Sequence, residues 1–244
     1  MSVGDATDAL SLITRARQGE PRAVARLISW VEDGSPGLPR VMAELSGADT
    51  SAYVVGVTGS PGVGKSTTTS ALVAAFRARD QRVGVIAVDP TSPFSGGALL
   101  GDRIRMQQHA TDPGVFIRSM ASRGHLGGIA AATPQAIRVL EASGFHVVIV
   151  ETVGVGQSEV EVAGTAVATV VLLAPGMGDG IQAAKAGILE VADILCVNKA
   201  DRDGADATVR EIRHMLSLGT SDDGWQVPVV TSVASRGDVV RERR

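Results

Sequence analysis

Residues 59–66 read Gly-Ser-Pro-Gly-Val-Gly-Lys-Ser, which matches the G-x-x-x-x-G-K-[ST] pattern of a phosphate-binding loop. In such a loop successive backbone N–H groups converge on a polyphosphate, and a side chain at Gly59 or Gly64 would block that approach. Lys65 can reach the β- and γ-phosphates, and the Ser66 hydroxyl can bind Mg²⁺. The predicted nucleotide contacts are Gly59, Pro61, Gly62, Val63, Gly64, Lys65, Ser66 and Thr67.

A second motif, Asn198-Lys199-Ala200-Asp201, has the N-K-x-D pattern and follows another apolar run. A carboxylate at position 201 can accept hydrogen bonds from N1–H and the exocyclic amine of guanine. Adenine lacks that pair of donors and would leave the carboxylate unpaired, at a cost of several kcal/mol. The motif therefore predicts GTP or GDP as the ligand, with Asn198, Lys199 and Asp201 around the base. Ser232 and Val233, expected just after the last strand, are predicted to add backbone contacts to the base.

Acidic residues follow two further apolar runs. Asp89 comes directly after one run and Glu151 after another, where P-loop proteins place groups that orient magnesium-bound water. For Asp89, a turn or helix cap is an equally good interpretation. Asp102 opens a predicted helix, so an N-cap and a place near the metal both stay open.

The segment after Glu151 is rich in glycine, as suits a loop that responds to the γ-phosphate. Gly154 is predicted to meet the γ-phosphate through its N–H. Val155 stands where Ras-type proteins keep the glutamine that orients the attacking water, so slow intrinsic hydrolysis is expected. Gln157 is the candidate to replace that glutamine.

Apolar runs and helical segments alternate from residue 53 onward. This order predicts an α/β fold: a mostly parallel sheet with helices on both faces, like a P-loop NTPase G-domain, with a small N-terminal helical appendage. In such a sheet the ligand lies at the carboxyl ends of the strands. The predicted strands are 53–58, 83–88, 115–118, 145–150, 169–174, 193–198 and 227–231, and the predicted helices are 65–79, 101–110, 131–143, 181–191 and 204–217, with two or three more within 6–46.

The 244 residues are 44% hydrophobic and 20% charged, with a net charge of −3 and no extended basic run, which argues against nucleic-acid binding. The single cysteine, Cys196, excludes an intramolecular disulfide and is expected to be a small buried hydrophobe. No apolar stretch reaches transmembrane length, and no secretory signal or transit peptide is expected. We therefore expect a cytoplasmic protein.

The motifs together resemble the MeaB/ArgK family of P-loop GTPases, relatives of the methylmalonic aciduria type A protein. The resemblance implies a GTP-dependent chaperone of an adenosylcobalamin-dependent mutase, methylmalonyl-CoA mutase, which gates cofactor loading and protects the enzyme. It further implies that Asp89, Asp102, Glu151 and Ser66 surround Mg²⁺, and that Lys185 matches a family lysine that responds to the partner. The residues predicted to serve hydrolysis are Lys65, Glu151, Gln157 and Lys185. The matching segments are 59–67, 88–92, 101–106, 151–159, 175–179 and 198–201.

The predicted organisation is a helical extension over 1–50, a GTPase domain over 51–235 and a short tail over 236–244. The C-terminal region that forms the homodimer in the family is expected to be missing here. A homodimer therefore stays possible but does not follow from the resemblance. Three alternatives also stay open: an ATPase or kinase linked to amino-acid transport, a nickel-inserting GTPase, and a module that binds GTP or GDP without hydrolysing it. Four dispersed histidines and one cysteine disfavour the nickel protein.

Overall fold

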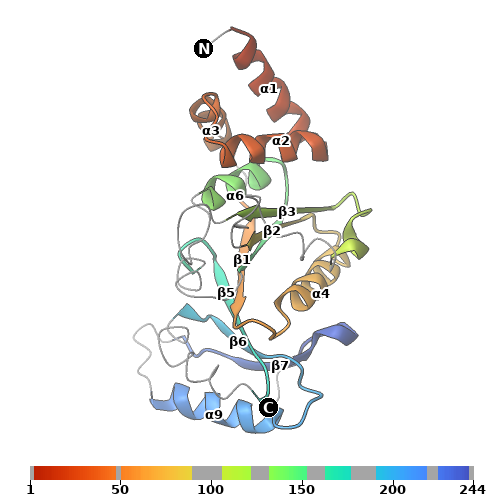
Figure 1. The fold of residues 1–244 in the computed structure, drawn as a ribbon, viewed down its shortest axis with the longest axis vertical. Coiled ribbons are helices and arrows are strands. Elements are labelled where there is room, and N and C mark those ends of the chain that lie inside the picture. The colour runs from red at the N-terminus through yellow and green to blue at the C-terminus, as the bar shows by residue number, and fades with distance from the viewer. Residues whose placement is uncertain are drawn as a thin grey trace, which may run out of the picture.

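The structure is a computed structural model that describes residues 3–47, 51–89, 106–121, 132–152, 163–176, 191–218 and 225–241. The described residues form an eight-stranded sheet in the order β3-β2-β4-β1-β5-β6-β7-β8 (Figure 1). The strands are β1 (Tyr53–Gly59), β2 (Val83–Asp89), β3 (Val115–Ala121), β4 (Val147–Thr152), β5 (Ala168–Leu173), β6 (Ile194–Val197), β7 (Val229–Val233) and β8 (Asp238–Arg241).

Strands β1 to β7 pair in parallel, which confirms the predicted α/β fold. β8 alone runs antiparallel, against β7. The sequence predicts only a short tail over 236–244 after the last parallel strand, and here the structure differs. A single 3-10 turn, η4 (Ala234–Arg236), is closed by Gly237 at φ +71°, and the chain then returns alongside β7. A left-handed residue of this kind reverses the chain without steric cost only when it is glycine.

Helices cover both faces of the sheet. On one face lie α1 (Val3–Arg17), α2 (Pro21–Glu32), α3 (Leu38–Ser46) and α6 (Thr133–Ala142), whose apolar side chains join those of β2, β3 and β4 in one core. The opposite face is covered by α4 (Lys65–Arg77). α9 (Ala205–Leu218) packs on β5, β6 and β7 on the same face as α6. Because both faces are covered, the central strands are almost continuously apolar, as β4 illustrates with every residue buried.

The N-terminal helices share their interior with the rest of the fold. α2 and α3 pack against α6, and Figure 1 places the three of them above the sheet. Arg118 on β3 forms an ion pair with Glu32 and donates to Ser29 Oγ at 3.1 Å, which ties α2 to the edge strand. Residues 1–50 and the domain predicted over 51–235 therefore share one continuous core. The boundary between them stays a prediction from the sequence.

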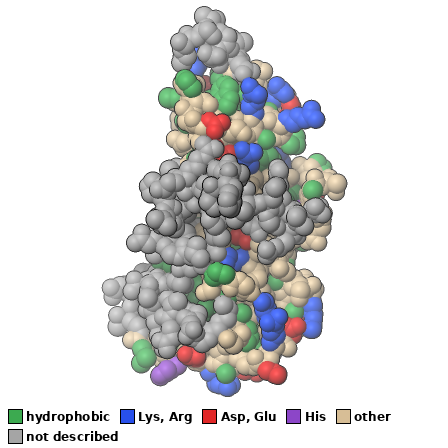
Figure 2. Space-filling model, in the orientation of Figure 1, with side chains coloured by type: hydrophobic (Ala, Val, Ile, Leu, Met, Phe, Trp, Pro, Cys, Tyr) green, Lys and Arg blue, Asp and Glu red, His purple; other side chains and the backbone are tan. Residues whose placement is uncertain are grey.

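Most element positions agree with the prediction within a few residues. The helix predicted over 101–110 is described only from 106, where a 3-10 turn, η1 (Gln107–His109), is found. The helix predicted over 181–191 lies, apart from its last residue, outside the described residues. None of the described helices is both long and apolar enough to cross a membrane. Charged side chains of both signs are interspersed over the N-terminal helices and over α9 (Figure 2).

An ion pair joins the end of α4 to the loop before β3. Arg77 Nε donates to Asp112 Oδ2 at 2.9 Å, and Gly114 N–H donates to Asp112 Oδ1 at 2.8 Å. The Arg77 hydrogen bond and that of Gly114 lower the pKa of the Asp112 carboxyl below its usual value. The charged form of Asp112 is therefore favoured in the folded state.

The pH dependence of stability follows from this pair. Because the pKa of Asp112 is lowered on folding, its contribution is fully present above the unfolded pKa of about 4 and is lost as the pH falls through the lower folded value. In urea unfolding, Asp112→Asn should destabilise the chain at pH 7 and cost less near pH 3. The exposed Asp203 supplies the control Asp203→Asn. An equal cost of Asp112→Asn at both pH values would contradict the assignment.

Candidate nucleotide-binding site

The phosphate-binding loop connects β1 to α4 and is built from left-handed glycines. Gly59, Gly62 and Gly64 have φ values of +132°, +80° and +100°. A Cβ on Gly59 would lie 2.2 Å from the carbonyl oxygen of Leu172, and a Cβ on Gly64 would lie 2.4 Å from Asn198 Nδ2. The loop thus needs glycine at these two positions because β5 and the Asn198 side chain after β6 approach it, in addition to the reason expected from phosphate access.

Lys65 and Ser66 open α4, with their side chains buried at the foot of the loop. Lys65 Nζ donates to the carbonyl oxygens of Gly59 at 2.7 Å and Ser60 at 3.1 Å. The ammonium group is therefore held by the same loop that would surround a phosphate chain. The positive end of the α4 dipole lies at this position and favours an anion there.

Ser66 is joined directly to the second predicted motif. Its hydroxyl donates to Glu151 Oε1 at 2.7 Å, and both side chains are buried. Glu151 lies near the end of β4, beside β1, and the next residue, Thr152, donates through Oγ1 to Thr58 Oγ1 at 2.9 Å. The structure therefore brings together the two predicted oxygen ligands that it describes.

The remaining predicted phosphate and metal residues are less fully described. Asp89 is the last residue of β2, two positions beyond the pairing partner of Glu151, but its side chain is not described. Asp102, Gly154, Gln157 and Lys185 lie outside the described residues. Within the described part of the chain, no group of three or more His, Cys, Asp or Glu side chains could hold a metal ion.

The described donors nonetheless suit Mg²⁺. Mg²⁺ prefers hard oxygen ligands and is usually held by one or two protein oxygens together with water and substrate phosphates. A serine hydroxyl and a buried carboxylate 2.7 Å apart, at a helix N-terminus, provide such a set. Ser66 and Glu151 are thus the residues that would hold the ion, which would neutralise charge on the phosphates.

Asn198 connects the base-reading loop to the phosphate-binding loop. Its Nδ2 donates to the carbonyl oxygen of Val63 at 2.8 Å. Its Oδ1 accepts from Ser232 Oγ at 3.0 Å and from Ala234 N–H at 3.2 Å. A buried amide has to satisfy both its ends, so this side chain fixes three segments relative to one another.

Lys199 and Asp201 complete the motif at the carboxyl end of β6. Lys199 has a left-handed backbone at φ +57°, and its Nζ donates to the carbonyl oxygen of Gly62 at 2.6 Å. Such a conformation costs free energy in a residue with a side chain, and it is typical of functional sites. Asp201 is partly exposed and accepts from Arg236 Nη2 at 3.2 Å.

Ser232 and Val233 are the last two residues of β7, whereas the sequence places them after that strand. The buried Ser232 hydroxyl is engaged with Asn198, so the described role of Ser232 is to hold that amide. Cys196 Sγ lies 3.2 Å from the same hydroxyl. Burial raises the pKa of the Cys196 thiol, with partial compensation by the Ser232 hydrogen bond, which agrees with an inert buried cysteine.

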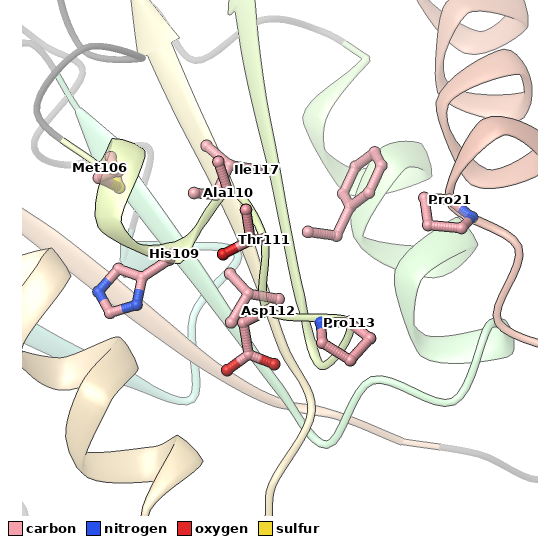
Figure 3. Close-up of a pocket in the computed structure, with 10 residues that line it drawn as sticks. Pro21, Met106, His109, Ala110, Thr111, Asp112, Pro113 and Ile117 are labelled. Atoms are coloured by element: carbon pink, nitrogen blue, oxygen red, sulfur yellow. The ribbon is translucent and has the colours of Figure 1, made fainter.

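A separate pocket of about 590 Å³ lies between η1, β3 and the start of α2, and its lining shares no residue with the phosphate-binding loop (Figure 3). Most of the lining is apolar, including Met106, Pro113 and Phe116. His109 points from this region toward α4, where its Nε2 lies 3.0 Å from Ser70 Oγ. The charged and polar groups predicted to bind the nucleotide converge instead at the loop of residues 59–66.

Three contacts of the site are absent from the sequence prediction. They are the Thr58–Thr152 hydrogen bond, the engagement of Ser232 with Asn198, and the Arg236–Asp201 ion pair. Each joins residues 34 to 94 positions apart, so no short motif contains them. The only sequence signal for Arg236 is its position directly before a glycine that follows a predicted strand.

A parallel sheet with a phosphate-binding loop after β1 and an N-K-x-D loop after β6 defines a P-loop GTPase. Comparison with known families agrees. The family described as "Methylmalonyl Co-A mutase-associated GTPase MeaB" matches residues 24–243, so the chain belongs to the MeaB family.

Individual relatives support this assignment. The chain is 52% identical over 234 residues to a Pyrococcus abyssi protein named "Putative GTPase", covering 95% of this chain and 72% of that protein. It is 41% identical over 241 residues to GTPase ArgK of Escherichia coli, again covering 95% and 72%. The mitochondrial methylmalonic aciduria type A homolog of Caenorhabditis elegans is 43% identical over 174 residues, with 70% of this chain and 44% of that protein covered.

The fold is also found in a solved relative. A crystal structure titled LAO/AO transport system kinase superimposes with a TM-score of 0.76 at 29% identity, covering 95% of this chain and 71% of that one. The predicted membership of the MeaB/ArgK family, with its link to the methylmalonic aciduria type A protein, is thereby confirmed.

The two glycines at positions 62 and 64 allow a matched test of the loop geometry. Both have positive φ, but no described atom lies within 4 Å of a Cβ on Gly62, whereas a Cβ on Gly64 meets Asn198. Gly62→Ala should cost only the left-handed strain, about 1–2 kcal/mol. Gly64→Ala should cost about 1–3 kcal/mol more, because it displaces a buried amide. Urea unfolding measures both, and equal losses would contradict the packing described here.

Proposed function

We propose that the protein is a Mg²⁺-dependent GTPase that acts as a chaperone for a cobalamin-dependent acyl-CoA mutase, methylmalonyl-CoA mutase or a relative. In this role it gates cofactor loading and protects the mutase in the cytoplasm. The observation that carries the nucleotide part is the joining of the two loops: Asn198 to Val63 at 2.8 Å, and Lys199 to Gly62 at 2.6 Å. A phosphate site and a guanine-reading carboxylate on one framework suit a guanine nucleotide.

Phosphoryl transfer depends mainly on positioning the reacting groups and on stabilising charge. Lys65 Nζ, held by two carbonyl oxygens of the loop, is within reach of phosphate oxygens and would exchange those partners for them. Ser66 and Glu151 would hold Mg²⁺, with Asp89 and Asp102 as further candidates. The metal would supply neutralisation of phosphate charge.

Hydrolysis by the isolated chain is expected to be slow. Val155 cannot orient an attacking water, and Gln157 is the candidate that replaces the missing glutamine. Lys185 is the candidate residue that responds to the partner and so assists hydrolysis when the partner binds. In this proposal Gly154 contacts the γ-phosphate, so the segment after β4 responds to the nucleotide state. The partner enzyme would thus read GTP and GDP as two different signals.

The identity of the partner rests on the family. The matched family is described as mutase-associated, and one relative is named for methylmalonic aciduria, a name that supports the same enzyme. The solved relative's title, a transport system kinase, favours an ATP-dependent alternative. The N-K-x-D loop argues against that alternative, because adenine would leave Asp201 without base donors.

Turnover measurements test the proposal. The isolated chain with Mg²⁺ should hydrolyse GTP slowly, ATP far more slowly, and GTP faster once a cobalamin-dependent mutase is added. Fast turnover by the chain alone, or equal turnover of ATP and GTP, would contradict it. Release of no phosphate in single-turnover reactions, with the mutase present, would favour a GTP- or GDP-binding module without hydrolysis.

Glu151→Gln tests the metal assignment. The glutamine keeps the shape and can still accept from Ser66, but it lacks the charge that attracts a divalent cation. We expect GTP turnover to fall by about 10²–10³-fold and to need more Mg²⁺, while GDP still binds. Glu211→Gln, at an exposed position on α9, is the control for loss of one charge. An unchanged Mg²⁺ requirement in Glu151→Gln would exclude Glu151 from the metal site.

A further inference from the structure

Arg236 contacts the carboxylate proposed to read the base. Its Nη2 donates to Asp201 Oδ2 at 3.2 Å, with the two side chains 65% and 35% exposed. Arg236 ends η4, after β7, and Asp201 lies in the loop after β6. These strands are neighbours in the sheet, so the two loops meet at its carboxyl edge. The N-K-x-D pattern itself contains no partner for its aspartate.

The exposed Arg236–Asp201 ion pair contributes little to the free energy of unfolding, because solvent screening and the cost of ordering both side chains offset the attraction. The contact uses one N–H of Arg236 and one oxygen of Asp201. Since each carboxylate oxygen can accept two hydrogen bonds, this contact with Arg236 leaves Oδ1 and one site on Oδ2 for the donors of a base, as far as the described residues go.

The backbone on both sides of the pair is fixed. Ala234 N–H donates to Asn198 Oδ1 at 3.2 Å, and Ala200 N–H donates to the carbonyl oxygen of Ser232 at 3.0 Å. Gly237 N–H closes the η4 turn by donating to Ala234 at 3.2 Å. Arg236 therefore reaches Asp201 from a rigid position and restricts the rotation of a partly exposed carboxylate. Such ordering, made before binding, strengthens binding.

We propose that Arg236 is a positioning residue for guanine recognition, which holds the Asp201 carboxylate in the orientation that accepts both N1–H and the exocyclic amine. The inference rests on the proposed function, because it concerns the same base site. Guanine depends on this orientation for two hydrogen bonds. Hypoxanthine, which lacks the exocyclic amine, depends on it for one. Arg236 thus contributes to the preference for GDP over IDP.

The experiment is calorimetric titration of the full chain with GDP and IDP in the presence of Mg²⁺. Arg236→Ala should weaken GDP binding about three- to tenfold and IDP binding less, so the ratio of the two affinities falls. Arg202→Ala is the matched control: it removes the same charge from an exposed residue next to Asp201 in the sequence. Arg202→Ala should leave both affinities unchanged.

Two further variants separate positioning from a structural effect. Asp201→Ala should weaken GDP binding, and Arg236→Ala added to it should have no further effect, because the carboxylate through which Arg236 acts is gone. Arg236→Lys should restore part of the GDP/IDP ratio, since it keeps the charge without the planar fork of donors. Thermal unfolding of every variant confirms that the fold is retained.

The outcomes are distinct. An unaltered chain that binds no GDP overturns the proposed function and this inference together. If GDP binds and Arg236→Ala leaves the GDP/IDP ratio unchanged, weakens both nucleotides equally or strengthens GDP, the inference alone is overturned. The inference is supported if Arg236→Ala lowers the ratio of GDP to IDP affinity in the otherwise unaltered chain and has no such effect when Asp201→Ala is also present.

Discussion

The site depends above all on the buried side chain of Asn198. Its amide donates to the phosphate-binding loop at Val63 and accepts from Ser232 and Ala234 beyond β7. Leaving either end of a buried amide unpaired would cost about 1–3 kcal/mol, so the three segments are held in one arrangement. Gly64 is part of the same constraint, because a Cβ there would overlap this amide. The phosphate-binding loop and the N-K-x-D loop consequently form a single framework rather than two independent loops.

The polar groups of this framework already have partners within the protein. Lys65 is held by the carbonyl oxygens of Gly59 and Ser60, and Ser66 donates to Glu151. In the proposed function, nucleotide binding would therefore exchange hydrogen bonds, and its net free energy would be the difference between old and new partners. Because these buried polar groups have partners within the protein, the loop can be stable without a ligand and can still exchange those partners for an anion. Family membership places this chemistry among the MeaB GTPases.

Much of this could be predicted from the sequence, for physical reasons. The buried parallel strands are continuous apolar runs, and the two motifs are short enough to be read directly; Ser66 meets Glu151 as expected. β8 could not be predicted, because its edge sequence, Asp-Val-Val-Arg, has too few residues to show a period. The Arg236–Asp201 pair could not be predicted either, since it arises only when β6 and β7 become neighbours.

Calorimetric titration of Asn198→Ala with GDP and Mg²⁺ tests the central claim most directly, with Ser232→Ala as a milder change to the same network. If Asn198 unites the two loops, Asn198→Ala should remain folded and bind GDP at least about tenfold more weakly, and Ser232→Ala should lose less. Undiminished GDP affinity in a folded Asn198→Ala chain would contradict the account, because phosphate and base would then be held independently.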